Sequence, residues 1–167
     1  MTDIEDISSV SSMRIAQIRK MDVSNGEGLG VSIFTSGCSY HCKNCFNSTL
    51  WDYSVGEVWE QKHEDLVVSL CKKDYVKRFS MLGGEPLIER NIEPLTKLCK
   101  RLKTEKPSIK IWCYTGGLYE EQMKRKNVVE LFKFVDVLVD GPYIEDLKDY
   151  RLLWRGSSNQ RVLRLTK

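Results

Sequence analysis

The stretch VSIFTSGCSYHCKNC, residues 31–45, joins an apolar run to a loop with three closely spaced cysteines. The run at 31–34 predicts a buried strand that leads directly into this loop. Iron-sulfur cubes and structural zinc ions both normally take four protein ligands. Three thiolates therefore predict an open iron-sulfur site, in which one iron remains free to bind a substrate. The three candidate ligands are Cys38, Cys42 and Cys45.

Three other interpretations of the cysteine loop are possible. A disulfide pair is disfavoured because the loop holds an odd number of cysteines and the chain has no export signal. A zinc site would need a second Cys or His pair at motif spacing, and only His41, inside the loop, is nearby. Buried core thiols are disfavoured by polar neighbours such as Lys43 and Asn44. The spacing together with the motifs below favours the open iron-sulfur site.

The chain length predicts one domain. Its 167 residues are too few for a complete eight-unit barrel, which needs about 250. We expect a flexible leader at 1–12 and a single domain at 13–167, because the first residues are acidic, serine-rich and lack an apolar signal core. No apolar run is long enough to span a membrane, and all six cysteines are expected to be free thiols. These features predict a cytoplasmic protein without a membrane partner.

The charge distribution argues against a nucleic-acid partner. The formal net charge is +3, and no cluster of Lys and Arg is interleaved with aromatic residues. The C-terminal part is basic, and we expect a solvated edge there, with docking to an acidic surface as the alternative. Its basic residues are Arg151, Arg155, Arg161, Arg164 and Lys167.

The order of the predicted elements indicates an α/β fold. An edge strand is predicted at 13–21, and buried strands at 31–34, 78–82, 109–114 and 134–139. Helices are predicted at 57–73, from a cap at Asn91 to about Leu102, and at 119–132. Strands separated by helices favour a mostly parallel sheet with right-handed crossovers. We therefore expect an incomplete (β/α) barrel, or curved open sheet, of about five to six strands.

Four motifs follow the carboxyl ends of the predicted parallel strands: the cysteine loop, GGEP at 83–86, TGG at 115–117 and DGPY at 140–143. Ligands bind beyond these ends in such folds, so the motifs are expected to form one site. Gly83 and Gly84 allow close backbone approach to a ligand, and Glu85 can accept hydrogen bonds from an ammonium group. Thr115 offers a hydroxyl, although TGG and DGPY also suit plain turns.

Other polar and sulfur-bearing residues are interpreted as structural. His63 lies on the apolar face of its predicted helix, where a hydrogen-bonded boundary histidine is expected. The remaining cysteines, Cys71, Cys99 and Cys113, fall at core positions and are expected to act as small buried hydrophobes. The run at 154–160 reads as a loop, with no chemistry derivable from its composition.

The motifs resemble those of the radical S-adenosylmethionine superfamily. CSYHCKNC at 38–45 matches its CxxxCxxC signature, and GGEP matches the motif that holds the methionine amino group. More narrowly, the region 22–161 resembles the activating proteins of anaerobic ribonucleoside-triphosphate reductases. The matching runs are NGEG at 25–28, CFNSTLW at 45–51, LGGEPL at 82–87, IWCYTG at 111–116, VDVLVDGPY at 135–143 and LWRGSSNQ at 153–160.

Two positions depart from the pattern of these relatives. The superfamily often has an aromatic residue before the third cysteine, where this chain has Asn44, although the reductase activators depart there too. An arginine common in the activators corresponds to Gly30, so the role of that position is not carried over.

The resemblance implies a cofactor set and a protein substrate. A 4Fe-4S cluster on Cys38, Cys42 and Cys45 would bind S-adenosylmethionine at its open iron, and no catalytic side chain beyond cluster and cofactor is implied. The backbone around Asn44 and Phe46 would border the adenine. The methionine end would be held by Gly83, Gly84 and Glu85, with a further cofactor contact from Thr115.

The partner implied by the resemblance is the large subunit of the reductase, and the electron donor is reduced flavodoxin or a similar protein. The activator would remove a hydrogen from a glycine Cα near the C-terminus of that subunit and leave a glycyl radical. The alternatives are another small radical S-adenosylmethionine enzyme, such as a different glycyl-radical activase or a carboxy-deazaguanine synthase, and a non-catalytic metal-binding module.

Overall fold

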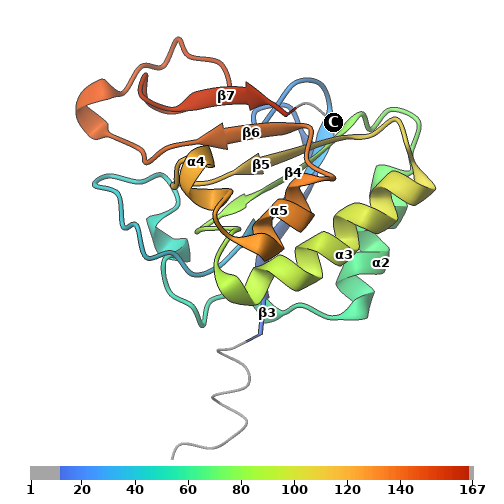
Figure 1. The fold of residues 1–167 in the computed structure, drawn as a ribbon. Coiled ribbons are helices and arrows are strands. Elements are labelled where there is room, and N and C mark those ends of the chain that lie inside the picture. The colour runs from blue at the N-terminus through green and yellow to red at the C-terminus, as the bar shows by residue number, and fades with distance from the viewer. Residues whose placement is uncertain (1–11, 166–167) are drawn as a thin grey trace, which may run out of the picture.

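The computed structural model describes residues 12–165, which form an α/β fold around one mixed sheet of seven strands (Figure 1). The strand order is β3-β1-β2-β4-β5-β6-β7. The four central strands, β2, β4, β5 and β6, are parallel, and the outer strands are antiparallel to their neighbours. The strand bounds are β1 Arg14–Asp22, β2 Gly30–Thr35, β3 Glu57–Val58, β4 Arg78–Gly83, β5 Lys110–Tyr114, β6 Val137–Asp140 and β7 Arg161–Arg164.

The sheet corrects two expectations. It has seven strands instead of five to six and is open within the described residues, with β3 and β7 at its edges. The strand predicted at 13–21 is not an edge strand, because Arg14 and Ile15 of β1 pair with β3. A two-residue strand such as β3 is too short to show a periodicity, and β7 follows a run that reads as a loop. The leader expected at 1–12 lies, apart from Ser12, outside the described residues.

The α-helices cover one face of the sheet (Figure 1). They are α2 Gln61–Cys71, α3 Glu89–Glu105, α4 Tyr119–Gln122 and α5 Lys126–Phe132, with short 3-10 helices η1 Ser48–Leu50 and η2 Glu145–Leu147. The helix predicted at 57–73 begins later because β3 occupies 57–58, and the helix predicted at 119–132 is broken after Gln122. Ile88, not Asn91, precedes the first turn of α3. None of the helices within 12–165 is long and apolar enough to cross a bilayer.

The main core lies between these helices and the sheet. Alternate strand residues such as Val31, Ile33 and Met81 point into it and meet the buried face of α3. The predicted burial of Cys71, Cys99 and Cys113 is confirmed, and desolvation raises the pKa of the Cys71 thiol to about 12. His63 is also buried: its Nδ1 accepts a hydrogen bond from the Glu60 backbone at 2.9 Å, as expected for a structural histidine.

The opposite face of the sheet carries a buried ion pair. Arg78 and Asp22 are 0% and 2% exposed, with 3.6 Å between Nη1 and Oδ2. Arg78 also donates from Nη2 to the Asp22 carbonyl at 2.5 Å. Burial alone would raise the pKa of Asp22, but hydrogen bonds from Ser32, Ser24 and Asn25 lower it to about 2. A Cβ on Gly30 would lie 2.5 Å from the Arg78 backbone oxygen and 2.8 Å from its guanidinium carbon, so a side chain there would displace both the backbone of β4 and this arginine.

The parallel register brings the four motif loops to one edge. Thr35, the last residue of β2, pairs with Gly83 at the end of β4, and Tyr114 at the end of β5 pairs with Val139 of β6. The cysteine loop, GGEP, TGG and DGPY therefore leave the sheet side by side. Figure 1 shows these ends at the side of the sheet where the loop after β2 and the segment between β6 and β7 also lie.

Candidate functional site

The cysteine loop is closed at its base by two backbone hydrogen bonds. Gly37 N donates to Leu50 O at 2.7 Å, and Cys38 N donates to Trp51 O at 3.2 Å. The His41 ring stacks on Trp51 with 4.6 Å between ring centroids. These contacts hold together the two ends of the segment that contains all three candidate ligands.

Left-handed backbone conformations curl the loop between its cysteines. His41 has φ 46° and Asn44 has φ 57°, a region that asparagine tolerates better than most residues do. The backbone conformation explains why position 44 is asparagine and not the aromatic residue common in the superfamily, because a bulky aromatic residue is disfavoured in this conformation. Asn44 and His41 allow the chain to reverse between Cys38, Cys42 and Cys45.

All four motif loops line one cavity of about 140 Å³, which we call the cysteine cavity. The sequence prediction that they form one site is confirmed in this respect. Among its lining residues are Cys38, Cys42, Cys45, Gly83, Gly84, Glu85, Thr115, Gly116, Gly141 and Tyr143. Three thiols and a carboxylate thus share one space with an open glycine backbone, a donor set that suits an iron-sulfur cluster with a zwitterionic ligand.

The three thiols do not converge closely enough to coordinate one metal ion together. Within residues 12–165, no group of three His, Cys, Asp or Glu side chains is arranged to hold a single metal ion. Cys38 is buried, whereas Cys42 and Cys45 are partly exposed. The ligand assignment rests on the shared cavity and the spacing of the three residues.

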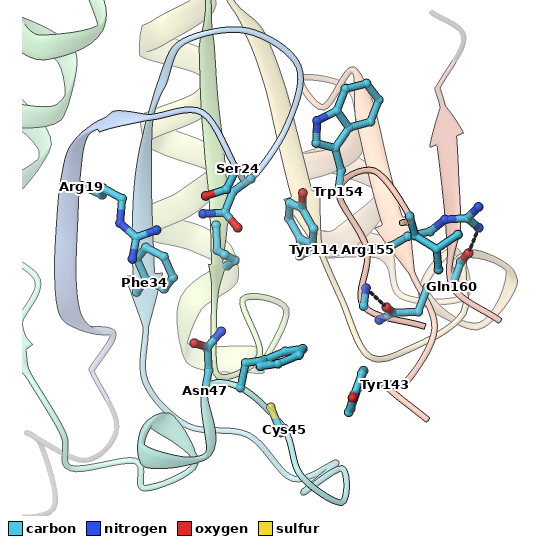
Figure 2. Close-up of a pocket in the computed structure, with 15 residues that line it drawn as sticks. Arg19, Ser24, Phe34, Cys45, Asn47, Tyr114, Tyr143, Trp154, Arg155 and Gln160 are labelled. Carbon is cyan, nitrogen blue, oxygen red and sulfur yellow. Dashed lines mark hydrogen bonds between the residues drawn. The ribbon is translucent and has the colours of Figure 1, made fainter. Parts of the chain in front are cut away.

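A second cavity of about 440 Å³, the side cavity, adjoins the first on the helix-free face of the sheet. Figure 2 shows its walls, with Phe34 and Asn47 on one side and Tyr143, Arg155 and Gln160 on the other. The two cavities share a wall, formed by Cys45, Asn47, Leu82, Tyr114, Tyr143 and Gln160. A group bound among the cysteines therefore lies next to a larger space that reaches the surface.

The glycines of GGEP are needed for backbone packing. Gly83 has φ 127°, and a Cβ there would lie 2.2 Å from Thr35 O. A Cβ on Gly84 would lie 2.6 Å from Gly37 O and 2.7 Å from Leu50 O. Gly84 N and Glu85 N donate to Thr35 O and Gly37 O at 2.9 and 2.8 Å. The GGEP loop is therefore bonded directly to the base of the cysteine loop.

Replacing Gly84 with alanine should loosen the cluster. The new methyl group pushes against two backbone carbonyls, which cannot move aside as a flexible side chain can, so the base of the cysteine loop must shift. We expect the variant to fold but to lose bound iron several-fold faster to a chelator than the unsubstituted protein. Equal rates of iron loss would show that the close packing at Gly84 does not support the loop.

Glu85 joins GGEP to the TGG loop. Its side chain is buried, and Oε1 accepts hydrogen bonds from Gly116 N at 2.7 Å and from the Thr115 hydroxyl at 3.1 Å. Oε2 accepts from Leu87 N at 3.0 Å. Burial raises the pKa of Glu85, although these hydrogen bonds oppose the rise. A carboxylate has about four acceptor positions, so one remains for a ligand.

The residues predicted to border the adenine do not line the same cavity as the other predicted cofactor residues. Thr115 and the GGE residues line the cysteine cavity, whereas Phe46 lines the side cavity, with its ring 5.3 Å from that of Tyr143. Asn44 lines neither of the two. Asn47, three residues further along, lines both.

Sequence reasoning missed the role of the run at 154–160. Gln160 Oε1 accepts from Gly156 N at 2.9 Å, and its Nε2 donates to Gly141 O at 3.0 Å. Asn159 Nδ2 donates to Pro142 O at 2.7 Å. The run therefore holds the DGPY exit in place and contributes to the wall between the cavities. The LWRGSSNQ match pointed to this run, but its composition showed only a turn.

The prediction that the basic C-terminal residues form a solvated edge is only partly correct. Arg161 is half exposed, yet it bonds the buried Asp140 through two nitrogens, at 2.5 and 2.9 Å. Asp140 also accepts from Tyr119 N at 2.8 Å. This carboxylate therefore holds β7 and the start of α4 on the end of β6.

The fold and the site together define a class of protein. Its members have an open α/β sheet, with a cavity at the carboxyl edge that is lined by three cysteines close together in the sequence. The family described as a 4Fe-4S single cluster domain matches residues 24–163. A protein of Haemophilus influenzae is 36% identical over 154 residues, covering 91% of this chain and 98% of that protein. Proteins of Vibrio cholerae and Enterobacteria phage T4 are 37% and 33% identical, covering 92% and 90% of this chain and 99% and 93% of their own.

All three of these relatives are named anaerobic ribonucleoside-triphosphate reductase-activating protein. The chain belongs to the family of these activating proteins. The family resemblance inferred from the sequence motifs is thereby confirmed.

Proposed function

We propose that this protein activates an anaerobic ribonucleoside-triphosphate reductase by installing a glycyl radical on it. The family membership carries this proposal, and the cavity that joins three thiols to the GGE motif supports it. When bound, a 4Fe-4S cluster and S-adenosylmethionine supply a one-electron cleavage of the sulfonium bond, which releases methionine and a 5′-deoxyadenosyl radical. A hydrogen atom from a glycine Cα of the reductase would complete this chemistry, giving 5′-deoxyadenosine and the glycyl radical.

The residues of the chain bind and orient the cofactors. Cys38, Cys42 and Cys45 hold the cluster as thiolates. The free acceptor position of Glu85 would receive the methionine ammonium group, and Gly83, which lines the same cavity, would lie beside it. Backbone around Asn44 and Phe46 borders the adenine, and Thr115 orients Glu85 as well as facing the cavity. We regard the open sheet as an incomplete barrel of the radical S-adenosylmethionine type.

An open site suits a protein substrate. The side cavity reaches the surface beside Cys45, so a loop of another protein can enter it without opening the sheet. Glycine suits the hydrogen transfer because the lack of a side chain leaves its Cα accessible.

The electron comes from reduced flavodoxin or a similar donor. We place the protein in the cytoplasm, where thiols such as its six unpaired cysteines stay reduced.

The proposal is tested by anaerobic reconstitution with iron and sulfide. The product should be brown and should release 5′-deoxyadenosine when reduced with S-adenosylmethionine. Mixed with the anaerobic ribonucleoside-triphosphate reductase of the same organism, it should generate a glycyl radical doublet in the EPR spectrum. Cleavage without a doublet, but with turnover of a small-molecule substrate, would favour a different radical enzyme. A colourless zinc protein without cleavage would favour the non-catalytic binding module.

A further inference from the structure

The chain between β6 and β7 forms an arm, residues 143–158, that stands beyond the carboxyl ends of the parallel strands (Figure 1). Its two sides are bonded to each other. Asp149 N donates to Gly156 O at 3.2 Å, and Ser158 N donates to Leu147 O at 2.9 Å. The arm is thus a short hairpin whose tip comprises residues 150–155.

The outer side of the arm, by which we mean its exposed residues that line neither cavity, includes several large apolar side chains. Four large hydrophobic residues recur at every third position and are 39%, 41%, 81% and 67% exposed: Ile144, Leu147, Tyr150 and Leu153. Single exposed apolar residues are common, but a concentration of them marks an interaction surface. Tyrosine and leucine at the tip supply large contact areas with few rotatable bonds.

The charges of the arm are largely compensated within it. Lys148 pairs with Glu145 at 3.0 Å, and Arg151 pairs with Asp149 at 2.9 Å. The Lys148 ammonium also lies 5.2 Å from the centre of the Tyr150 ring. These groups therefore offer little net field to a charged partner, and contact with the arm should depend on apolar burial.

The inner side of the same arm lines the side cavity. Leu152, Trp154, Arg155 and Gly156 form part of its wall (Figure 2). Trp154 is anchored by an edge-on contact with Trp112, with 5.1 Å between ring centroids. A polypeptide that enters the side cavity must therefore pass alongside the arm, which is already held in place and loses little conformational freedom on binding.

We propose that the outer side of the arm is the docking surface for the reductase chain that carries the target glycine. The inference rests on the proposed function, because the substrate must be a polypeptide. Residues flanking the glycine contact Tyr150 and Leu153 while the glycine itself lies in the side cavity. The arm thus positions a protein substrate and takes no part in cofactor cleavage.

The test combines Tyr150→Ser with Leu153→Ser in the full-length, reconstituted protein. Neither residue lines the cysteine cavity or the side cavity. We expect the Kd for the reductase of the same organism to rise about 30-fold, as for loss of an interface hot spot. Glycyl radical formation at limiting concentration should fall to match. Raising sodium chloride from 50 to 500 mM should change the wild-type Kd less than about 5-fold, because the contact is mainly apolar.

The matched control is Tyr75→Ser with Leu66→Ser, the same two residue types at exposed positions on the α2 side of the molecule. This variant should bind the reductase as the unsubstituted protein does. Release of 5′-deoxyadenosine with dithionite, which needs no reductase, should be equal in all three proteins and shows that each is folded and loaded.

The possible outcomes separate the inference from the proposed function. If wild-type protein forms no glycyl radical on the reductase, the proposed function fails. If it does, and the arm variant has an unchanged Kd, the docking inference alone is overturned. A second copy of the chain is the other partner that this surface could bind, and sedimentation of the protein without reductase tests it. If the unsubstituted protein is a dimer and the arm variant is a monomer that still binds the reductase normally, the surface belongs to the dimer contact.

Discussion

Replacing Cys42 with alanine should almost eliminate reductive cleavage of S-adenosylmethionine in the reconstituted protein. Of the residues that the structure describes, three thiols line the cysteine cavity, so the loss of one leaves two ligands for the cluster. Disturbing the supporting residues of a metal site typically costs 10–100-fold, and we expect loss of a ligand itself to lower the rate by at least about 100-fold. The measurement is 5′-deoxyadenosine released under anaerobic conditions with excess dithionite. Cleavage at the wild-type rate would exclude Cys42 as a ligand.

The matched control is Cys71→Ala, which removes a thiol from the core. Cys71 is fully buried at the end of α2 and forms part of the hydrophobic cluster. This variant should bind the same amount of iron and sulfide as the unsubstituted protein, although it should unfold at a lower urea concentration. Equal loss of iron in both variants would mean that thiol number, and not position, determines cluster binding.

Replacing Asp22 with alanine should lower the free energy of unfolding by about 3–5 kcal/mol, the cost of leaving a buried charge without its partner. The charge in question is the Arg78 guanidinium, which is fully buried on the helix-free face of the sheet. Urea unfolding at pH 7 measures the effect. Asp52→Ala is the control, because that aspartate is exposed and its loss should lower the free energy of unfolding far less. Similar losses in the two variants would contradict the structural role of the ion pair.

Asp22 should also make stability depend on pH in the acid range. The pKa of Asp22 is about 2 in the folded protein, against an ordinary value of 3.8 that applies to the unfolded chain. The folded state therefore binds the proton more weakly than the unfolded state does. The resulting stabilisation, about 2 kcal/mol, is fully present above pH ~4 and is lost as the pH falls toward 2. In Asp22→Asn this part of the pH dependence should be absent. A constant difference between the two proteins across that range would show that Asp22 does not titrate with a lowered pKa.

Local sequence signals predicted the central part of the fold well. The run at 31–34 and the alternation before TGG correspond to β2 and β5, and the strand at 78–82 to β4. Each is a buried or alternating segment whose period is readable along the chain. The turn-forming glycines marked where these strands end. Since parallel strands align their carboxyl ends, the meeting of four motifs in one cavity followed from the order of elements.

Elements stabilised by distant partners were not readable in this way. The strand β3 exists because Arg14 and Ile15 offer it an edge, and β7 because Asp140 and the β6 backbone hold it. The break between α4 and α5 carries no strong local signal either. For both strands the contact that decides the structure lies many residues away, so a local pattern contains little of it.

The sequence by itself determined the chemistry of this protein: three thiols within one loop, an acidic glycine motif after a buried strand, and strands arranged to bring both to one edge. Tertiary structure alone decided how that chemistry is presented. It engaged Glu85 with the TGG loop, paired Asp22 with Arg78 across 56 positions, and placed the arm beside the side cavity. The reason is physical, because ligand type and periodicity are properties of neighbouring residues, whereas burial and hydrogen bonding depend on which segments meet.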